Sequence, residues 1–256
     1  MIAGLDGLVG LTTAALWGGL IVFLRVGAAM IVLPALGEQM LSVRVKLVLS
    51  LALTSIVAPA VLPGIALPEP TFGHFVSALV TESLAGLFVG LMLRLFILAI
   101  QIAGSIAAQS TSLAQVLGSH GLDPLPAIGH VLTLSALALL MATGFHVKAA
   151  AYMVLSYDLL EPLQFPDPVA IADVGRHRIG ECFTLGFSLA APFVILSVLY
   201  NLTLGVINKA MPQLMVAFVG SPVITFGAIS MLLLCAPVIL TVWLGAVEAF
   251  LANPMR

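Results

Sequence analysis

The sequence predicts an all-α integral membrane protein, and three observations support this class. Hydrophobic residues make up 61% of the 256 residues and charged residues only 8%, whereas an ordinary soluble domain carries roughly 25% charged residues. The mean hydropathy is +1.22. Apolar residues also run continuously over long stretches, without the alternation of polar and apolar positions that marks the strands of a membrane barrel.

About six apolar segments are each long enough for the roughly 20 residues that cross a bilayer as a helix. In chain order they are residues 7–33, 45–67, 75–103, 126–147, 183–207 and 214–250. In the third segment Glu82, Gly86 and Gly90 follow one another at four-residue spacing and share one helix stripe. Gly86 and Gly90 form a GxxxG pair, which is typical of close contacts between membrane helices.

Prolines interrupt the last apolar segment. Pro222 and Pro237 would leave pieces of about 14 residues, and at 1.5 Å per residue each piece would span about 21 Å, less than the roughly 30 Å hydrocarbon core. We therefore expect broken helices or hairpins, with proline-kinked full spans as an equally supported alternative.

Two stretches separate the apolar segments. Residues 156–182 hold three prolines and most of the clustered acids, which predicts a water-exposed loop with short helices. Residues 104–125 are rich in Ser, Gly and Gln but almost uncharged. They fit either a plain connecting loop or a neutral segment that faces a protein-lined cavity or pore.

Charged residues inside or at the ends of apolar segments should each face a partner or a cavity, because an unpaired charge in lipid is costly. These residues are Arg25, Glu82, Arg94, Lys148, Glu181 and Glu248. Glu82 fits two interpretations, namely the polar anchor of a close helix contact and a proton or ion site. An alternative function follows from the second one: a secondary transporter with Glu82 and Arg94 in its pathway.

Several function classes are disfavoured. The net charge of -2 leaves no basic patch for nucleic acid. The five histidines have no metal-ligand spacing, and no catalytic motif is present, so we expect no enzyme, no cofactor and no metal. Asp123 precedes a proline and is more typical of a turn or helix cap than of a catalyst. Cys182 and Cys235 lie in apolar surroundings, which predicts buried free thiols.

Three stretches, taken in order, resemble one family. They are LRVGAAMIVLPALGEQMLSVRVKLVLSLAL (24–53), ESLAGLFVGLMLRLFILAIQIAGSIAAQ (82–109) and NLTLGVINKAMPQLMVAFVGSP (201–222). The residues that carry the resemblance are Arg25, Pro34, Arg44 and Lys46, then Glu82, Gly86, Gly90, Gln101, Gly104 and Gln109, then Asn201, Gly205, Asn208, Lys209, Pro212, Gln213, Gly220 and Pro222. Together they resemble the flagellar biosynthetic protein FliR family, to which the injectisome homologue SctT is related.

The resemblance implies a non-enzymatic subunit of the flagellar type III protein export gate. In that family one copy of the subunit joins several FliP-type and FliQ-type subunits in a helical funnel, with an FlhB-type subunit associated, in the bacterial inner membrane at the basal body. Unfolded flagellar proteins would pass through the channel. The resemblance also implies that residues 1–256 form a single export-gate domain of broken helices and hairpins, in contact with membrane lipid. Nucleic acid is not expected as a partner, because the sequence has no basic patch.

The resemblance also assigns residues to two roles. A loop after the third apolar segment plugs the pore in the family, and here it would comprise Gly104, Gln109, Ser110, Thr111, Ser112, Gln115, Gly118, Asp123 and Pro124. The remaining family residues from Arg25 to Pro222 would serve assembly and hairpin formation. Family members usually have glycine where this chain has Ser110 and Thr111, and they differ at Ser42 and Ser221. Because Ala107–Ser110 lacks the acid and arginine of the injectisome branch, the flagellar branch is preferred.

The 201–222 stretch also has a local interpretation: a helix end, a turn and the start of a second helix. Asn201 and Gly205 share a stripe, Asn208 can cap, Lys209 can face carbonyls at a helix C-terminus and Pro212 can open the next helix. Gln213 could then bond a neighbouring subunit.

Overall fold

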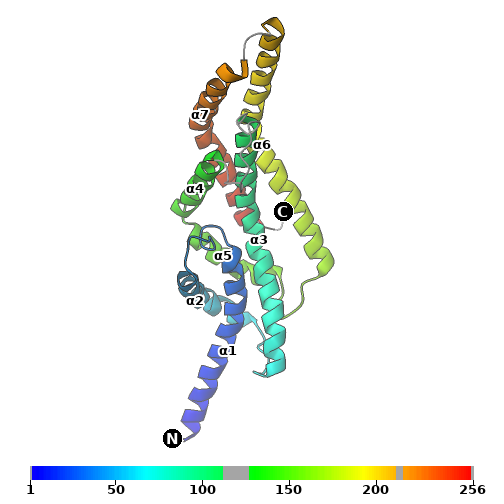
Figure 1. Ribbon diagram of the computed structural model, residues 1–256. Coiled ribbons are helices and arrows are strands. Elements are labelled where there is room, and N and C mark those ends of the chain that lie inside the picture. Colours follow the sequence, from blue (N-terminus) through cyan, green and yellow to red (C-terminus); the bar gives the residue numbers. More distant parts are fainter. Residues whose placement is uncertain (1, 112–126, 212–215, 255–256) are drawn as a thin grey trace. The chain divides into compact units, whose positions relative to one another are not determined.

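The computed structural model describes residues 2–111, 127–211 and 216–254, and all regular structure in these ranges is helical (Figure 1). The helices are α1 (Ile2–Val32), α2 (Val43–Val61), the short 3-10 turn η1 (Leu62–Gly64), α3 (Phe72–Thr111), α4 (Ala127–Ala142), α5 (Phe145–Leu159), α6 (Pro168–Ala210) and α7 (Val216–Ala252). The predicted all-α class is confirmed.

The apolar helices match the predicted number of segments. Five helices in the described ranges are long and apolar enough to cross a membrane, or six if α4 and α5 count as one broken span. The break between α4 and α5 lies at Gly144, whose φ of +76° is left-handed, a conformation that glycine adopts at little steric cost. The predicted segment 126–147 is therefore two helices instead of one.

Parts of both predicted loops are helical in the residues that the structure describes. Residues 168–182 form the beginning of α6, and residues 104–111 continue α3. At the start of α6, Asp167 Oδ1 accepts the Val169 N–H at 3.1 Å, next to Pro168, a favourable start for a helix. Charged pairs three residues apart, such as Arg176 with Asp173, then support a polar helical turn where composition suggested a loop.

The prolines of α7 do not cut it into pieces. The helix is continuous through Pro222 and Pro237, as α6 is through Pro192. A proline removes one backbone hydrogen bond, whereas ending the helix would free several N–H and C=O groups in surroundings without water. The alternative of long spans that contain proline therefore holds here.

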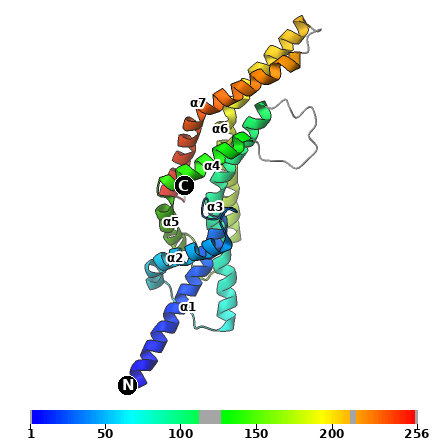
Figure 2. The ribbon, with the colours of Figure 1, turned by 60° about the vertical axis from the view of Figure 1, so that its left-hand side comes forward.

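The chain forms two compact units, each described here by itself. Unit 1 comprises residues 1–94 and 141–177, and unit 2 comprises residues 95–140 and 178–256. In unit 1, α2 packs against α1 and α5 (Figure 2), and the Trp17 indole N–H donates to the Pro68 carbonyl at 2.9 Å. Its core is apolar, with Ile21, Val22, Val26, Val57, Ala78, Ala85, Val89, Phe145, Ala149 and Met153 all buried.

In unit 2 the end of α6 and the start of α7 run side by side as a hairpin (Figures 1 and 2). Away from this hairpin, two side chains tie the other ends of the two helices to α3: the Trp243 indole N–H of α7 donates to the Phe96 carbonyl at 2.7 Å, and the Cys182 thiol of α6 donates to the Leu95 carbonyl at 3.1 Å. Cys182 is buried and Cys235 is half-buried, and both thiols are free. The prediction of a buried free thiol is thus confirmed for Cys182.

Candidate functional site

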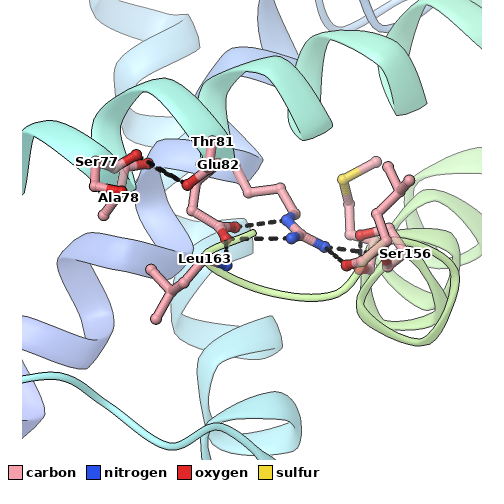
Figure 3. Close-up of polar contacts among 9 residues, drawn as sticks. Ser77, Ala78, Thr81, Glu82, Ser156 and Leu163 are labelled. Atoms are coloured by element: carbon pink, nitrogen blue, oxygen red, sulfur yellow. Dashed lines mark hydrogen bonds and ion pairs between the residues drawn. The ribbon is translucent and has the colours of Figure 1, made fainter. Parts of the chain in front are cut away.

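Among the described residues, the two fully buried charges form one ion pair in unit 1 (Figure 3). Arg25 lies on α1 and Glu82 on α3, and both are 0% exposed. Arg25 Nε donates to Glu82 Oε2 at 2.6 Å, and Arg25 Nη2 donates to Glu82 Oε1 at 3.2 Å. This two-bond arrangement is the strongest geometry that a guanidinium and a carboxylate can adopt.

The same pair also binds the backbone between α5 and α6. Arg25 Nη1 donates to the carbonyls of Ser156 and Leu160, both at 3.0 Å. These carbonyls belong to the C-terminal end of α5, where a cation is favourable. The Ser156 carbonyl also accepts the Leu160 N–H at 3.0 Å. Glu82 Oε1 accepts the Leu163 N–H at 2.6 Å. The pair therefore holds three parts of unit 1 together.

Leu163 and Tyr157 add two further features to this cluster. Leu163 has a φ of +62°, a left-handed conformation that costs a non-glycine residue of order 1 kcal/mol and that needs support from its surroundings. The Glu82 carboxylate supplies that support through the Leu163 N–H. The guanidinium carbon of Arg25 lies 3.9 Å from the centroid of the Tyr157 ring, a distance that stabilises a cation over an aromatic face.

Two glycines let α3 approach α1 closely enough for the ion pair to form. A Cβ on Gly86 would overlap the backbone carbonyl of Arg25, and a Cβ on Gly90 would lie 2.8 Å from the carbonyl oxygen of Ala29. The GxxxG prediction of a close helix contact is confirmed, with α1 as the partner helix. Glu82 is the polar anchor of that contact.

A second polar cluster holds the connection between α1 and α2. Lys46 Nζ donates to the Gly37 carbonyl at 2.8 Å, and Arg94 forms an ion pair with Glu38. A Cβ on Gly37 would lie 2.7 Å from three backbone carbonyls at the end of α1, so only glycine fits. Pro34 lies in this connection and Arg44 is exposed in the first turn of α2.

The other charges in or near apolar segments also have partners. Arg178 Nη1 donates to Glu181 Oε2 at 2.8 Å, and Lys148 and Glu248 each have an interaction partner. The expectation that all six charged residues face a partner is confirmed. Arg94 pairs with Glu38 and not with Glu82, so the structure does not bring the two residues of the transporter alternative together.

Part of the predicted plug lies on the end of α3. Gly104, Gln109, Ser110 and Thr111 are helical, so the expectation that they belong to a loop is wrong. The predicted Ser112, Gln115, Gly118, Asp123 and Pro124 lie outside the described residues. Gln109 is exposed, and the Ser110 hydroxyl donates to the Ala107 carbonyl at 2.9 Å.

Gly104 has a packing role that its position in the sequence did not reveal. A Cβ on Gly104 would overlap the Cα of Gly129 on α4, so the two backbones are in contact. Buried alanines flank this contact on α3, at positions 103 and 107. The helices on either side of residues 112–126 are therefore held together at Gly104 and Gly129.

We expect Gly104→Ala to destabilise unit 2 by roughly 1–3 kcal/mol, because the new methyl group meets backbone, which cannot move aside as a side chain can. Gly245→Ala is the matched control, since a Cβ on Gly245 has nothing within 4 Å. Thermal stability of the detergent-solubilised protein would measure both changes. Equal stability of the two variants would contradict the close contact.

The 201–222 stretch has the predicted order of helix, connection and helix, since α6 ends at Ala210 and α7 begins at Val216. Asn201 Nδ2 donates to the Ser197 carbonyl at 2.9 Å. Lys209 is in the last turn of α6 as expected, whereas Asn208 lies within that turn and not at a cap position. Gly205 is exposed on α6, and Gly220 and Pro222 lie in the first turns of α7. Pro212 and Gln213 lie outside the described residues.

The backbone partners of the ion pair were not identified from the sequence. Ser156, Leu160 and Leu163 contribute a carbonyl or an N–H. Every residue carries the carbonyl, and every residue except proline carries the N–H. The only signal was indirect: a buried arginine has more donors than one carboxylate can accept.

In the described part of the chain, no group of three or more His, Cys, Asp or Glu side chains could hold a metal ion.

Comparisons with known proteins agree with one another. The family described as bacterial export proteins, family 1, matches residues 16–250. The chain is 33% identical over 226 residues to a flagellar biosynthetic protein FliR of Caulobacter vibrioides, covering 87% of this chain and 90% of the relative. It is 29% identical to the FliR of Escherichia coli over 84% of this chain and 83% of the relative. It is also 27% identical to the FliR of Bacillus subtilis over 87% of each.

Proposed function

Because this chain belongs to the bacterial export proteins of family 1, the family of flagellar biosynthetic protein FliR, we propose that it is a subunit of the flagellar type III protein export gate. The match over residues 16–250 carries this proposal. The long apolar helices agree with a multi-pass protein of the bacterial inner membrane. Deleting the gene tests the proposal directly, since motility and flagellar protein export should both be lost.

The subunit works with other proteins of the export apparatus, and we propose FliP-type, FliQ-type and FlhB-type subunits as its partners. The support is the family relationship together with the large apolar surface that the chain leaves exposed, such as Phe226, Leu233 and Leu234 at 72–77% exposure. Soluble monomers rarely expose such surface. We further propose that the whole chain acts as one structural domain of the gate and that it catalyses no reaction.

We propose that the segment after α3 faces the path of the exported protein, on the basis of the family resemblance. Gln109 supports this proposal, because it is exposed at the end of α3 without any nearby charge in the sequence. Single cysteines placed at positions 106–118 should crosslink to an export substrate stalled in the gate. If no position in this range crosslinks, the segment does not line the path.

The polar residues at the end of α6 are proposed to serve assembly. Asn208 is exposed there, and an exposed amide on an apolar helix needs water or a partner. We expect Asn208→Leu to lower the yield of assembled gate several-fold, with Thr203→Leu as control because the Thr203 hydroxyl already donates to the Leu199 carbonyl in its own helix. Normal yield of complex with lost export would instead assign Asn208 to transport.

The secondary-transporter alternative has less support. An ion pathway needs a group that can reach water, whereas Arg25 and Glu82 are fully buried and have each other and the backbone as partners. Proteoliposomes that contain the purified chain alone distinguish the two functions. A gate subunit alone should transport no small solute, and specific uptake would favour the alternative.

A further inference from the structure

A buried hydroxyl group beside the ion pair of unit 1 has no partner in the protein. Tyr157, near the end of α5, is only 8% exposed, and its hydroxyl oxygen has no hydrogen-bond partner among the described residues. The large majority of buried side-chain polar atoms in folded proteins are hydrogen-bonded to protein or to ordered water. The Tyr157 hydroxyl therefore needs an explanation.

Arg25 leaves a second donor free in the same cluster. A guanidinium has five N–H groups, and four of them are used, by the two carboxylate oxygens of Glu82 and by the carbonyls of Ser156 and Leu160. The fifth N–H, on Nη2, has no acceptor among the described residues. Because Arg25 is 0% exposed, bulk solvent does not reach this donor either.

The two free donors lie close together. The guanidinium carbon of Arg25 is 3.9 Å from the centroid of the Tyr157 ring, and the hydroxyl is a substituent of that ring. No direct hydrogen bond joins the two side chains, but one small molecule with about 2.8 Å to each partner can bridge a gap of this size. Glu82 Oε2 accepts only from Arg25 Nε, so it still has a free lone pair.

The chemistry of these groups selects the molecule that would bind them. Two free donors require an acceptor, and they would repel a cation. Arg25 and Glu82 already balance each other's charge, so an anion would add an unpaired charge in a buried position, which is costly. A side chain of a partner subunit could not reach the site, because Arg25 and Glu82 are 0% exposed and Tyr157 is 8% exposed within the chain itself.

We propose that a single buried water molecule binds here, accepting from the Tyr157 hydroxyl and from Arg25 Nη2 and donating to Glu82 Oε2. Three hydrogen bonds of this kind are typical of buried waters. The water makes the Tyr157 hydroxyl part of the anchor that joins α1, α3 and α5. This inference does not depend on what the protein exports.

Tyr157→Phe tests the proposal, because it keeps the aromatic ring over Arg25 and removes only the hydroxyl. With a bound water, the variant loses a hydrogen bond, and the ratio of unfolded to folded protein should rise about 2- to 10-fold. Chemical denaturation of the purified full-length chain in detergent measures this ratio. If the hydroxyl has no partner, its removal should leave the protein equally stable or more stable, and that result would overturn the proposal.

Tyr200→Phe on α6 is the matched control. The Tyr200 hydroxyl is also buried without a hydrogen bond, and the residue has no ion pair or ring contact with the described part of the chain. Because no free donor of a buried arginine lies beside it, this variant should be as stable as the wild type or more stable. An equal loss of stability in both variants would count against a special role of the Tyr157 hydroxyl.

Two measurements on the wild-type protein keep the proposal testable even if Tyr157→Phe fails to fold. A high-resolution map should show a solvent peak within about 3.2 Å of both the Tyr157 hydroxyl and Arg25 Nη2. An empty position in a map that resolves other buried waters would overturn the proposal. Exchange of chloride for gluconate in the buffer should leave stability unchanged, whereas a loss of stability would identify the occupant as an anion instead of water.

Discussion

Replacing Arg25 with glutamine should destabilise the protein by about 3–5 kcal/mol, because it leaves the Glu82 carboxylate as a buried charge without a counter-ion. The change also removes donors from the carbonyls of Ser156 and Leu160. We expect the assembled gate to be lost from detergent extracts at growth temperature. Its amount on native gels, followed over a temperature series, measures the effect.

The matched control is Arg176→Gln on α6. Arg176 also pairs with a carboxylate, that of Asp173, but the two side chains are 82% and 65% exposed. A surface pair of this kind contributes about 0–1 kcal/mol, so this variant should assemble normally. Equal losses in the two variants would mean that burial is not what makes the Arg25 pair important.

Exchanging the two charges should not restore stability. In the double variant Arg25→Glu with Glu82→Arg, the new carboxylate would face the carbonyls of Ser156 and Leu160, and the new guanidinium would face the Leu163 N–H. Acceptors would then face acceptors on one side of the pair, and donors would face a donor on the other side, so none of these backbone hydrogen bonds could form. Recovery of wild-type assembly in the exchanged variant would contradict this directional role.

The second large effect is expected at Gly86. A methyl group there would overlap the backbone carbonyl of Arg25, so α1 and α3 must separate, and the separation would also pull apart Arg25 and Glu82. We expect Gly86→Ala to destabilise by at least 1–3 kcal/mol through overpacking and Gly86→Val to abolish assembly. The temperature series on native gels applies here too.

Gly73→Ala on the same helix provides the comparison. A Cβ on Gly73 has nothing within 4 Å, and alanine has a higher helix propensity than glycine by up to about 1 kcal/mol. This variant should be neutral or slightly more stable. If Gly73→Ala and Gly86→Ala behaved alike, the close approach of α1 and α3 would be refuted.

The sequence predicted the helical class and the need for ion pairs, but not which charges would pair. An arginine in an apolar run requires a partner for energetic reasons, and that requirement is visible without a structure. Glu82 lies 57 residues from Arg25, however, and Arg94 was an equally available cation on the helix of Glu82. Only the packing of α1 on α3 decides between them, and that packing depends on long-range contacts.

The predicted loops were wrong for a related reason. Prolines and acids at 156–182 are typical of loops, yet Pro168 fits the first turn of a helix and the charged residues after it form pairs along α6. Composition reports the polarity of a segment more reliably than its backbone conformation. The two prolines of α7 were misleading in another way. Helix propensity alone predicts that each proline breaks the helix, but a break inside lipid or protein would leave several backbone groups without partners, and α7 continues through both prolines.

The contacts of Arg25 also bear on how the protein is made. Its carbonyl partner Ser156 lies 131 residues further along the chain, and a ribosome that adds about 5–20 residues per second needs roughly 7–26 s to reach it. During this interval the first helix emerges with its arginine unable to bind α5. Glu82 lies only 57 residues after Arg25, so of the groups that bind Arg25 in the folded protein, the Glu82 carboxylate is the first to be synthesised.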